Sequence, residues 1–225
     1  TIIIHYTAGS NAESAIRTLS DSERKVSAHL VVGRDGAVTQ LLPFNVVGWH
    51  AGVSKWGERE GFNKYSIGIE IDNAGQLEEK DGQYVSWFGQ AYPPEEVVRG
   101  VHRNQTQPTY WHRYPEEQIR VVEELCALLV AEYTIRHILG HEEIAPDRKI
   151  DPGPAFPLDD LRARLLSKPV PAAVAVAEVA VPSMAATVQA ARLNLRAEPA
   201  AASEKVVGYL KEGTAVEIIE EKGGW

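Results

Sequence analysis

The sequence has almost no cysteine, and it lacks any long uncharged apolar run. Its single cysteine, Cys126, cannot form an internal disulfide, and its place inside an apolar run indicates a small buried helix residue. The most apolar stretch is interrupted by Pro169, Pro171, Glu178 and Pro182, so no segment reaches the roughly 18 uncharged residues that a membrane helix needs. We therefore expect no transmembrane segment.

Basic residues are also fewer than acidic residues. Lysine and arginine number 23 against 31 aspartates and glutamates, which gives a net charge of -8 at pH 7. Surfaces that bind nucleic acid are usually basic, so we expect no nucleic-acid partner. No signal peptide is visible, because the chain opens directly on the strand-like run TIII. We expect the native N-terminus, with any targeting signal, to lie outside this sequence.

The composition separates the chain into three regions. Residues 1–166 carry mixed periodic patterns, whereas residues 167–187 are dominated by alanine, valine and proline, which predicts an extended linker. Residues 188–225 contain short apolar runs separated by glycine-containing turns, a pattern typical of a small all-β domain. A chain of 225 residues is long enough for one sizeable domain and one small domain.

In the first region, strand patterns alternate with helix patterns. Ile67, Ile69 and Ile71 alternate with small or polar residues, which predicts a strand with one buried face. The run that follows Pro115 has acidic residues in its first turn and apolar residues at helical spacing. We predict strands at 2–5, 28–32, 38–42 and 66–71, and helices at 11–19, 115–133 and 158–166. This order predicts an α/β fold with a mixed central β-sheet flanked by helices.

Two histidines and one aspartate stand out as candidate metal ligands. His5 ends the first predicted strand, His141 follows the apolar run ILG, and Asp151 lies in a loop rich in glycine and proline. Two imidazoles and one carboxylate would give zinc three protein ligands and leave its fourth position for water, which is typical of catalytic zinc. Residue types and spacing alone leave a structural role open for each of these histidines.

Five strings of residues follow one another in a specific order. They are IIHYTAG at 3–9, SAHLVVGRDG at 27–36, GWHAG at 48–52, SIGIEI at 66–71 and GHEEIAPDRKIDPGPAF at 140–156. Together they resemble the type 2 N-acetylmuramoyl-L-alanine amidase family, and the resemblance spans residues 1–166. It implies the fold that this family shares with peptidoglycan recognition proteins. It also implies a zinc enzyme that hydrolyses the bond between N-acetylmuramic acid and L-alanine in peptidoglycan.

The resemblance implies roles for the residues at matching positions. His5, His141 and Asp151 would bind Zn²⁺. Glu70 would be the catalytic acid/base, because a carboxylate can take a proton from water and pass it to the leaving amine. Lys149 would add positive charge where the reacting carbonyl oxygen becomes negative.

Three further residues of the family strings are expected to contact substrate: Trp49, His50 and His29. For His50 the alternative is contact with a metal ligand, and for His29 it is contact with a neighbouring strand. The remaining histidines are expected to be surface or structural residues; they are His102, His112 and His137.

Residues 76–114 form a long, irregular stretch that is rich in aromatic residues. Long structured loops in compact domains are often functional, so this stretch could form a wall of the substrate groove. The alternative is that the aromatic side chains anchor the stretch to the rest of the domain. We favour anchoring for most of them.

Residues 188–225 are similar to bacterial SH3-like wall-binding modules, which usually continue beyond the position of Trp225. We therefore expect a small SH3-like barrel that is incomplete in this sequence. A wall-binding module favours an extracytoplasmic location and peptidoglycan or muropeptides as partners, rather than cytoplasmic recycling of muropeptides. The main alternative to an enzyme is a recognition module that binds muropeptides without cleaving them. The presence of all three expected zinc ligands favours catalysis.

Overall fold

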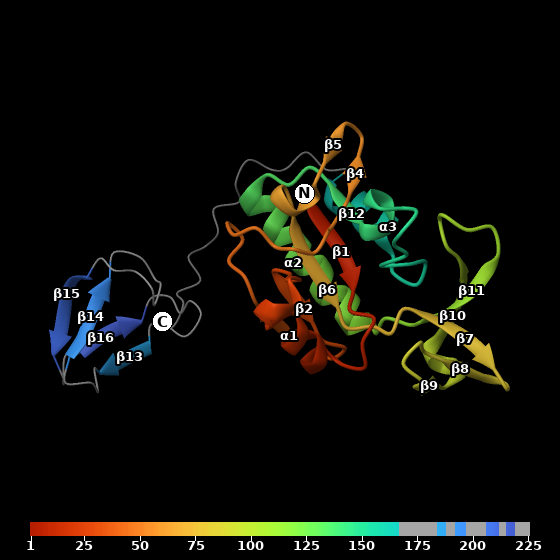
Figure 1. The fold of residues 1–225 in the computed structure, drawn as a ribbon, viewed down its shortest axis with the longest axis horizontal. Helices are drawn as coiled ribbons and strands as arrows, with labels where there is room; N and C mark the ends of the chain where they lie inside the picture. Colours follow the sequence, from red (N-terminus) through yellow and green to blue (C-terminus); the bar gives the residue numbers. More distant parts are fainter. Residues whose placement is uncertain (167–183, 188–191, 197–205, 212–214, 219–225) are drawn as a thin grey trace. The chain divides into compact units, whose positions relative to one another are not determined.

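A computed structural model describes residues 1–166, 184–187, 192–196, 206–211 and 215–218 of the chain (Figure 1). The chain divides into two compact units, Thr1–Val170 and Pro171–Trp225. The first unit contains two five-stranded sheets, a two-stranded hairpin and all of the described helices.

A five-stranded mixed sheet forms the centre of the first unit. Its strands are β1 (Ile2–Tyr6), β2 (Leu30–Val32), β3 (Val38–Gln40), β6 (Ile67–Ile71) and β12 (Ile138–Gly140), in the order β12-β1-β6-β2-β3. Strand β1 is parallel to both β6 and β12, β2 is parallel to β6, and only β3 is antiparallel. The predicted α/β fold with a mixed central sheet is therefore confirmed.

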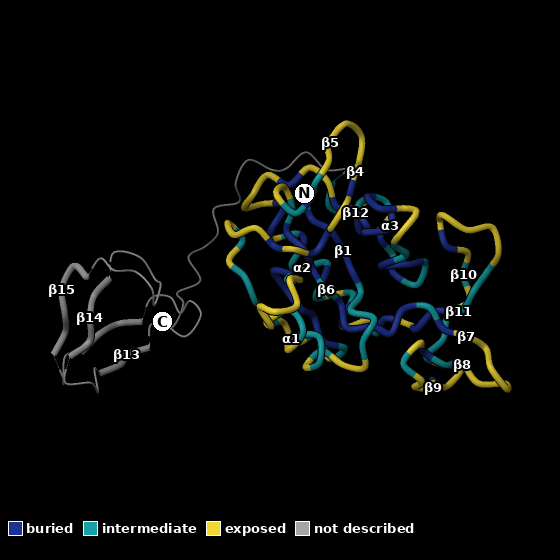
Figure 2. The backbone as a smooth tube through the Cα atoms, in the orientation of Figure 1, coloured by how far each residue is buried: buried dark blue, intermediate teal, exposed yellow. Residues whose placement is uncertain are grey.

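One face of this sheet packs against helices α2 (Glu116–Tyr133) and α4 (Leu158–Leu166). Figure 1 shows α2 running behind β1 and β6. Ile4 of β1 and Ile69 of β6 are fully buried in one apolar cluster with Val122 and Cys126 of α2. Helix α2 begins after Pro115, as predicted, because proline cannot donate the backbone hydrogen bond that continues a helix. The same strands look dark blue in Figure 2, which marks burial.

The opposite face of the sheet is covered by irregular chain and a short helix. Residues 44–66 include the hairpin of β4 (Lys55–Trp56) and β5 (Arg59–Glu60) and the 3-10 turn Phe62–Lys64. Helix α3 (His141–Ile144) follows β12 directly. Ile3, Phe62, Leu139 and Ile144 form a second, smaller apolar cluster on this face. This thin cover leaves polar residues of the strands close to the surface.

The shorter predicted elements of the first region are also present. Helix α1 (Ala12–Ser20) is capped by Asn11, whose side chain accepts a hydrogen bond from the backbone N–H of Ser14 at 2.8 Å. It is followed by the 3-10 turn Ser22–Arg24. Strands β2 and β3 form the predicted hairpin, and Gly36 in its turn has a positive φ of 82°.

The expectation of an irregular stretch at residues 76–114 is wrong. These residues form an antiparallel sheet, called here the accessory sheet, with the strand order β10-β11-β7-β8-β9. Its strands are β7 (Gln76–Lys80), β8 (Gln83–Val85), β9 (Ala91–Tyr92), β10 (Val97–Val101) and β11 (Pro108–His112), with the 3-10 turn Pro94–Glu96 between β9 and β10. The strands are short and their polar faces are exposed, so the hydrophobic alternation that predicts a strand is weak.

Most aromatic residues of the accessory sheet pack within the sheet itself. Leu77 and Tyr92 are buried in a small cluster, and Tyr84, Phe88 and Tyr110 pack against it. These side chains therefore stabilise the accessory sheet itself, which differs from the predicted anchoring to the rest of the domain. Trp87 is the exception, since 77% of it is exposed. His102 and His112 are buried structural residues, whereas His137 is exposed.

The second unit is described only through four strands. Strand β14 (Arg192–Arg196) pairs with β15 (Val206–Lys211), and β13 (Met184–Thr187) pairs with β16 (Ala215–Ile218), both antiparallel. Strand β13 lies inside the range predicted as a linker, 167–187. The rest of that range, 167–183, and Trp225 lie outside the described residues. Among the helices that are described, none is both long and apolar enough to span a bilayer.

Candidate metal centre

The candidate ligands His5, His141 and Asp151 come from three segments that end at one edge of the central sheet. His5 lies near the end of β1, and His141 begins α3 immediately after the neighbouring parallel strand β12. The carboxyl ends of parallel strands meet at the same edge of a sheet, which is where α/β proteins usually bind ligands. Asp151 reaches this edge because the backbone N–H of Glu142 donates to the carbonyl of Asp151 at 2.8 Å.

The three side chains present one atom each to a common point. Nδ1 of His5 lies 2.9 Å from Nδ1 of His141, and Oδ2 of Asp151 lies 3.0 Å from each of these nitrogens. All three residues are at least 94% buried. Tetrahedral zinc with bonds of about 2.1 Å holds its ligand atoms about 3.4 Å apart, so the triangle is within about half an ångström of that geometry. Two nitrogens and one carboxylate oxygen are also the atom types that zinc prefers.

The hydrogen bonds around His141 determine which of its nitrogens carries the proton. Its Nε2 lies 3.1 Å from the carbonyl oxygen of Ala51, which can only accept a hydrogen bond. In the neutral imidazole Nε2 therefore carries the hydrogen, and Nδ1 offers a lone pair to the cluster. A backbone carbonyl on the remote nitrogen is a common way to orient a metal-binding histidine.

A chain of three hydrogen bonds orients His5 in the same way. The Ser66 hydroxyl donates to the carbonyl of Phe62 at 2.6 Å, so its oxygen is free to accept from Nε2 of His50 at 3.4 Å. Nδ1 of His50 is then an acceptor, and Nε2 of His5 donates to it at 2.9 Å. It follows that Nδ1 of His5 also has its lone pair directed into the cluster.

The glycine of the string SIGIEI makes room for this chain. A β-carbon on Gly68 would lie 2.5 Å from Cγ of the His50 ring, closer than any side chain could tolerate. His29 packs edge-on behind His50, with ring centroids 5.7 Å apart. Both nitrogens of His29 are hydrogen-bonded to backbone groups: Nδ1 accepts from the Gly68 N–H, and Nε2 donates to the Val46 carbonyl. His29 is thus the one predicted substrate residue that the structure does not bring to the cleft.

The pKa values of His5 and Asp151 are shifted in the direction that metal binding requires. Burial lowers the pKa of His5 to about 4, so its imidazole is neutral at physiological pH. The pKa of the Asp151 carboxyl lies below its ordinary value, although burial acts to raise it. A neutral imidazole and an ionised carboxylate are the forms that bind a metal ion.

The cluster lies at the bottom of a cleft of about 410 Å³, which Glu70 and Lys149 also line. Glu70 is the direct neighbour of His5 in the parallel register of β1 and β6. Burial raises the pKa of Glu70 to about 8, and the nearby charge of Asp151 acts in the same direction. A carboxyl group with a pKa near neutrality is well suited to take up and release a proton.

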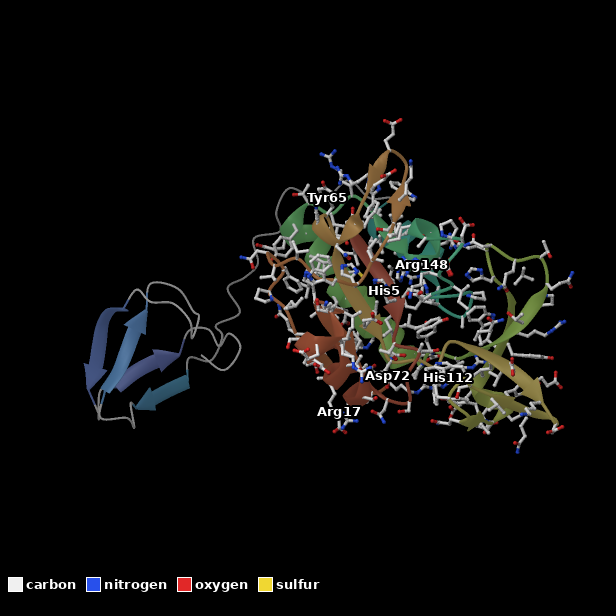
Figure 3. The ribbon with its side chains drawn as sticks, viewed as in Figure 1. His5, Arg17, Tyr65, Asp72, His112 and Arg148 are labelled. Carbon is white, nitrogen blue, oxygen red and sulfur yellow. The ribbon has the colours of Figure 1, made fainter. Side chains whose placement is uncertain are left out.

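The cleft is also lined by Trp49, His50 and Arg148. Trp49 is 61% exposed, whereas His50 is buried. Arg148 is not among the predicted site residues, although it lies beside Lys149 in the longest string. Its guanidinium donates to the carbonyls of Ala51 at 2.9 Å and Val53 at 2.8 Å. Figure 3 labels Arg148 close to His5, and both residues line this cleft.

The chain is similar in sequence to known amidases. A family model for N-acetylmuramoyl-L-alanine amidase matches residues 1–154. The chain is 36% identical over 132 residues to the 1,6-anhydro-N-acetylmuramyl-L-alanine amidase AmpD of Escherichia coli, covering 59% of this chain and 54% of AmpD. It is 31% identical over 169 residues to the N-acetylmuramoyl-L-alanine amidase AmiD of Escherichia coli, covering 71% of this chain and 51% of AmiD.

A solved structure of E. coli AmiD with the substrate anhydro-N-acetylmuramic acid-L-Ala-D-γ-Glu-L-Lys has a similar fold. It matches with a TM-score of 0.55 and 29% identity, over 73% of this chain and 56% of that one. The chain therefore spans little more than half the length of these relatives. Since the family match covers more than half of the sequence, the chain belongs to the N-acetylmuramoyl-L-alanine amidase family.

Proposed function

We propose that this chain hydrolyses the amide bond between N-acetylmuramic acid and the L-alanine of the stem peptide, with one Zn²⁺ held by His5, His141 and Asp151. The observation that carries the proposal is the triangle of two imidazole nitrogens and one carboxylate oxygen at the bottom of a cleft. Zinc bound by these residues would polarise the amide carbonyl and lower the pKa of water to about 7.

Glu70 is proposed to transfer protons, and Lys149 is proposed to stabilise negative charge. The Glu70 carboxylate accepts a proton from the attacking water and returns it to the amine of L-alanine as the carbon–nitrogen bond breaks. Lys149 places its ammonium group in the same cleft, where it stabilises the negative charge on the carbonyl oxygen. Membership of both residues in the lining of this cleft supports these roles.

His50 is proposed to orient His5 in addition to lining the cleft. Its Nδ1 lies 2.9 Å from Nε2 of His5, and such outer partners of metal ligands often affect metal affinity. Trp49 is proposed to contact substrate at the rim, since it is exposed and lines the cleft. His29 is proposed to support His50 from behind.

The proposed substrate is peptidoglycan or a muropeptide released from it. The relative AmpD is named for 1,6-anhydro-N-acetylmuramyl-L-alanine, and the AmiD structure holds an anhydro-N-acetylmuramic acid peptide.

The experiment that tests the proposal is digestion of a purified anhydro-muropeptide by the zinc-loaded protein, with products identified by mass spectrometry. The expected products are the free sugar acid and a peptide with L-alanine at its amino end. Binding of the muropeptide without any cleavage would instead support a recognition module. Parallel digestion of intact sacculi shows whether polymer is also a substrate.

We also propose that residues 188–225 belong to an SH3-like wall-binding module outside the cytoplasm, joined to the amidase domain at 1–166 by a linker that starts at residue 167. The antiparallel pairs β14-β15 and β13-β16 support a small β domain. Sedimentation with insoluble sacculi tests the binding role. The full chain carrying Glu70→Ala should bind more strongly than the same chain ended at Val170, and equal binding would contradict the proposal.

A further inference from the structure

A buried carboxylate lies directly beside the candidate ligand His141. Glu142 is only 2% exposed, and its side chain accepts from Nε2 of His102 at 2.6 Å, from Nε of Arg103 at 2.7 Å and from the backbone N–H of Gly153 at 3.1 Å. A carboxylate removed from water needs several donors of this kind to remain ionised. None of these contacts involves substrate, so the function proposed above leaves this group unexplained.

Glu142 holds the backbone at the third ligand, Asp151, and two residues beyond it. Its own N–H donates to the Asp151 carbonyl at 2.8 Å, and its carboxylate receives the N–H of Gly153. The ligand His141 is the preceding residue in the chain. One residue therefore connects two of the three candidate ligands through backbone and side-chain bonds.

Two of the three donors to the Glu142 carboxylate come from the turn that follows β10 of the accessory sheet. His102 and Arg103 follow directly after β10. The backbone N–H of Asn104 donates to Nδ1 of His102 at 3.1 Å, so Nε2 of His102 carries the hydrogen that Glu142 accepts. The His102 ring also stacks on Trp111 of β11, with ring centroids 5.6 Å apart.

The same part of the accessory sheet contacts the ligand loop at two more points. A β-carbon on Gly153 would lie 2.6 Å from the Trp111 ring, so the loop and the ring are in close contact. The hydroxyl of Tyr114 donates to the carbonyl of Pro152 at 2.9 Å. Residues 102–114 thus pack against and hydrogen-bond to the segment 151–153, which carries Asp151.

We propose that His102 and Glu142 are positioning residues that hold Asp151 in place for the metal ion, so that the accessory sheet sets the metal affinity of the centre. This inference rests on the metal-binding part of the proposed function. The reason is that the His102 N–H fixes the Glu142 carboxylate, and this carboxylate fixes the loop that carries Asp151. Loss of the His102 donor leaves a buried carboxylate with one partner fewer, and the loop must shift to regain one.

The test measures the dissociation constant of Zn²⁺ by competition with a coloured chelator, for the full chain and four variants. His102→Ala removes the donor and should weaken zinc binding by about 10- to 100-fold, the range typical of outer partners of a metal site. His102→Gln restores an N–H at a similar reach and should recover most of the affinity. Arg103→Met removes the second donor at a partly exposed position, so it keeps the test valid if His102→Ala fails to fold.

The matched control is Glu123→Gln, which removes an ion pair with Arg164 at the surface. This variant should bind zinc like the unchanged chain. Melting of each metal-free variant separates stability from affinity, because a purely structural role would lower the melting temperature without changing the zinc dissociation constant of the folded protein.

Two results would overturn the inference, and they differ from each other. If the unchanged chain binds zinc and both His102→Ala and Arg103→Met bind it equally tightly, the positioning role is wrong while the proposed function stands. If the unchanged chain binds no zinc, the metal centre itself is wrong, and the positioning role falls with it.

Discussion

The two faces of the central sheet are made by the same strands, yet they differ in chemistry. One face presents Ile4 and Ile69, which are buried against α2. The other face presents His5 and Glu70, which line the cleft. Because side chains alternate along a strand, each strand can build a core and a site at once. The apolar face stabilises the sheet, and the stable sheet holds the polar groups of the other face at fixed distances.

The comparison predicts that changes on the polar face alter metal binding or chemistry, whereas changes on the apolar face alter stability. The largest effect is expected for Asp151→Ala, which removes one of the three candidate ligands. The protein should fold but lose almost all of its zinc and its amidase activity, because two imidazoles alone hold the ion weakly. Zinc content after dialysis, measured by mass spectrometry, checks this. Full zinc occupancy in the variant would rule Asp151 out as a ligand.

The next largest effect is expected for Glu70→Ala. This change removes a proton acceptor and leaves the three ligands in place, so zinc content should stay normal while kcat falls by about 10²- to 10⁴-fold. The measurement is the rate of muropeptide cleavage by zinc-loaded protein. A rate close to that of the unchanged chain would show that another group transfers the proton.

On the apolar face, Ile69→Ala should act through stability alone. Ile69 is fully buried, and a truncation of this kind costs about 2–5 kcal/mol of unfolding free energy. Chemical denaturation measures that cost. The zinc dissociation constant of the folded fraction should be unchanged, and a large change in it would mean that the two faces are not independent.

The smallest effect is expected for Ser66→Ala, which breaks the chain Ser66–His50–His5 at its outer end. One hydrogen bond contributes about 1 kcal/mol, so zinc affinity should fall only by about fivefold. Ser86→Ala is the matched control, because Ser86 is buried and its hydroxyl donates to a carbonyl within the accessory sheet. Equal zinc affinity for both variants would show that the His50 chain does not orient His5.

Much of the first unit follows from local patterns in the sequence. The apolar run at the start of the chain, the alternation around Ile69 and the helical spacing after Pro115 each predict the element that is observed. Residue types and positions point to the three candidate ligands, the family resemblance implies the same three, and the structure brings them together. The accessory sheet was missed because its strands are short and mostly exposed, so their sequence carries little periodicity.

Other features depend on contacts between residues far apart in the chain. No local pattern indicates that His50 bonds to His5, that both nitrogens of His29 are used by backbone, or that His102 is buried against Glu142. A histidine looks the same in a sequence whether it lines a cleft, supports another ring or holds a buried carboxylate. Its role is decided by what the neighbouring strands bring within about 3 Å of its nitrogens.

Periodicity and side-chain chemistry therefore indicate most strands of the central sheet, the helices packed on it and the residue types able to bind a metal. Contacts between distant segments set the hydrogen bonds of the imidazoles, the environment that raises the pKa of Glu70, and the link between the accessory sheet and the ligand loop. Each of these depends on distances between segments that no local pattern encodes.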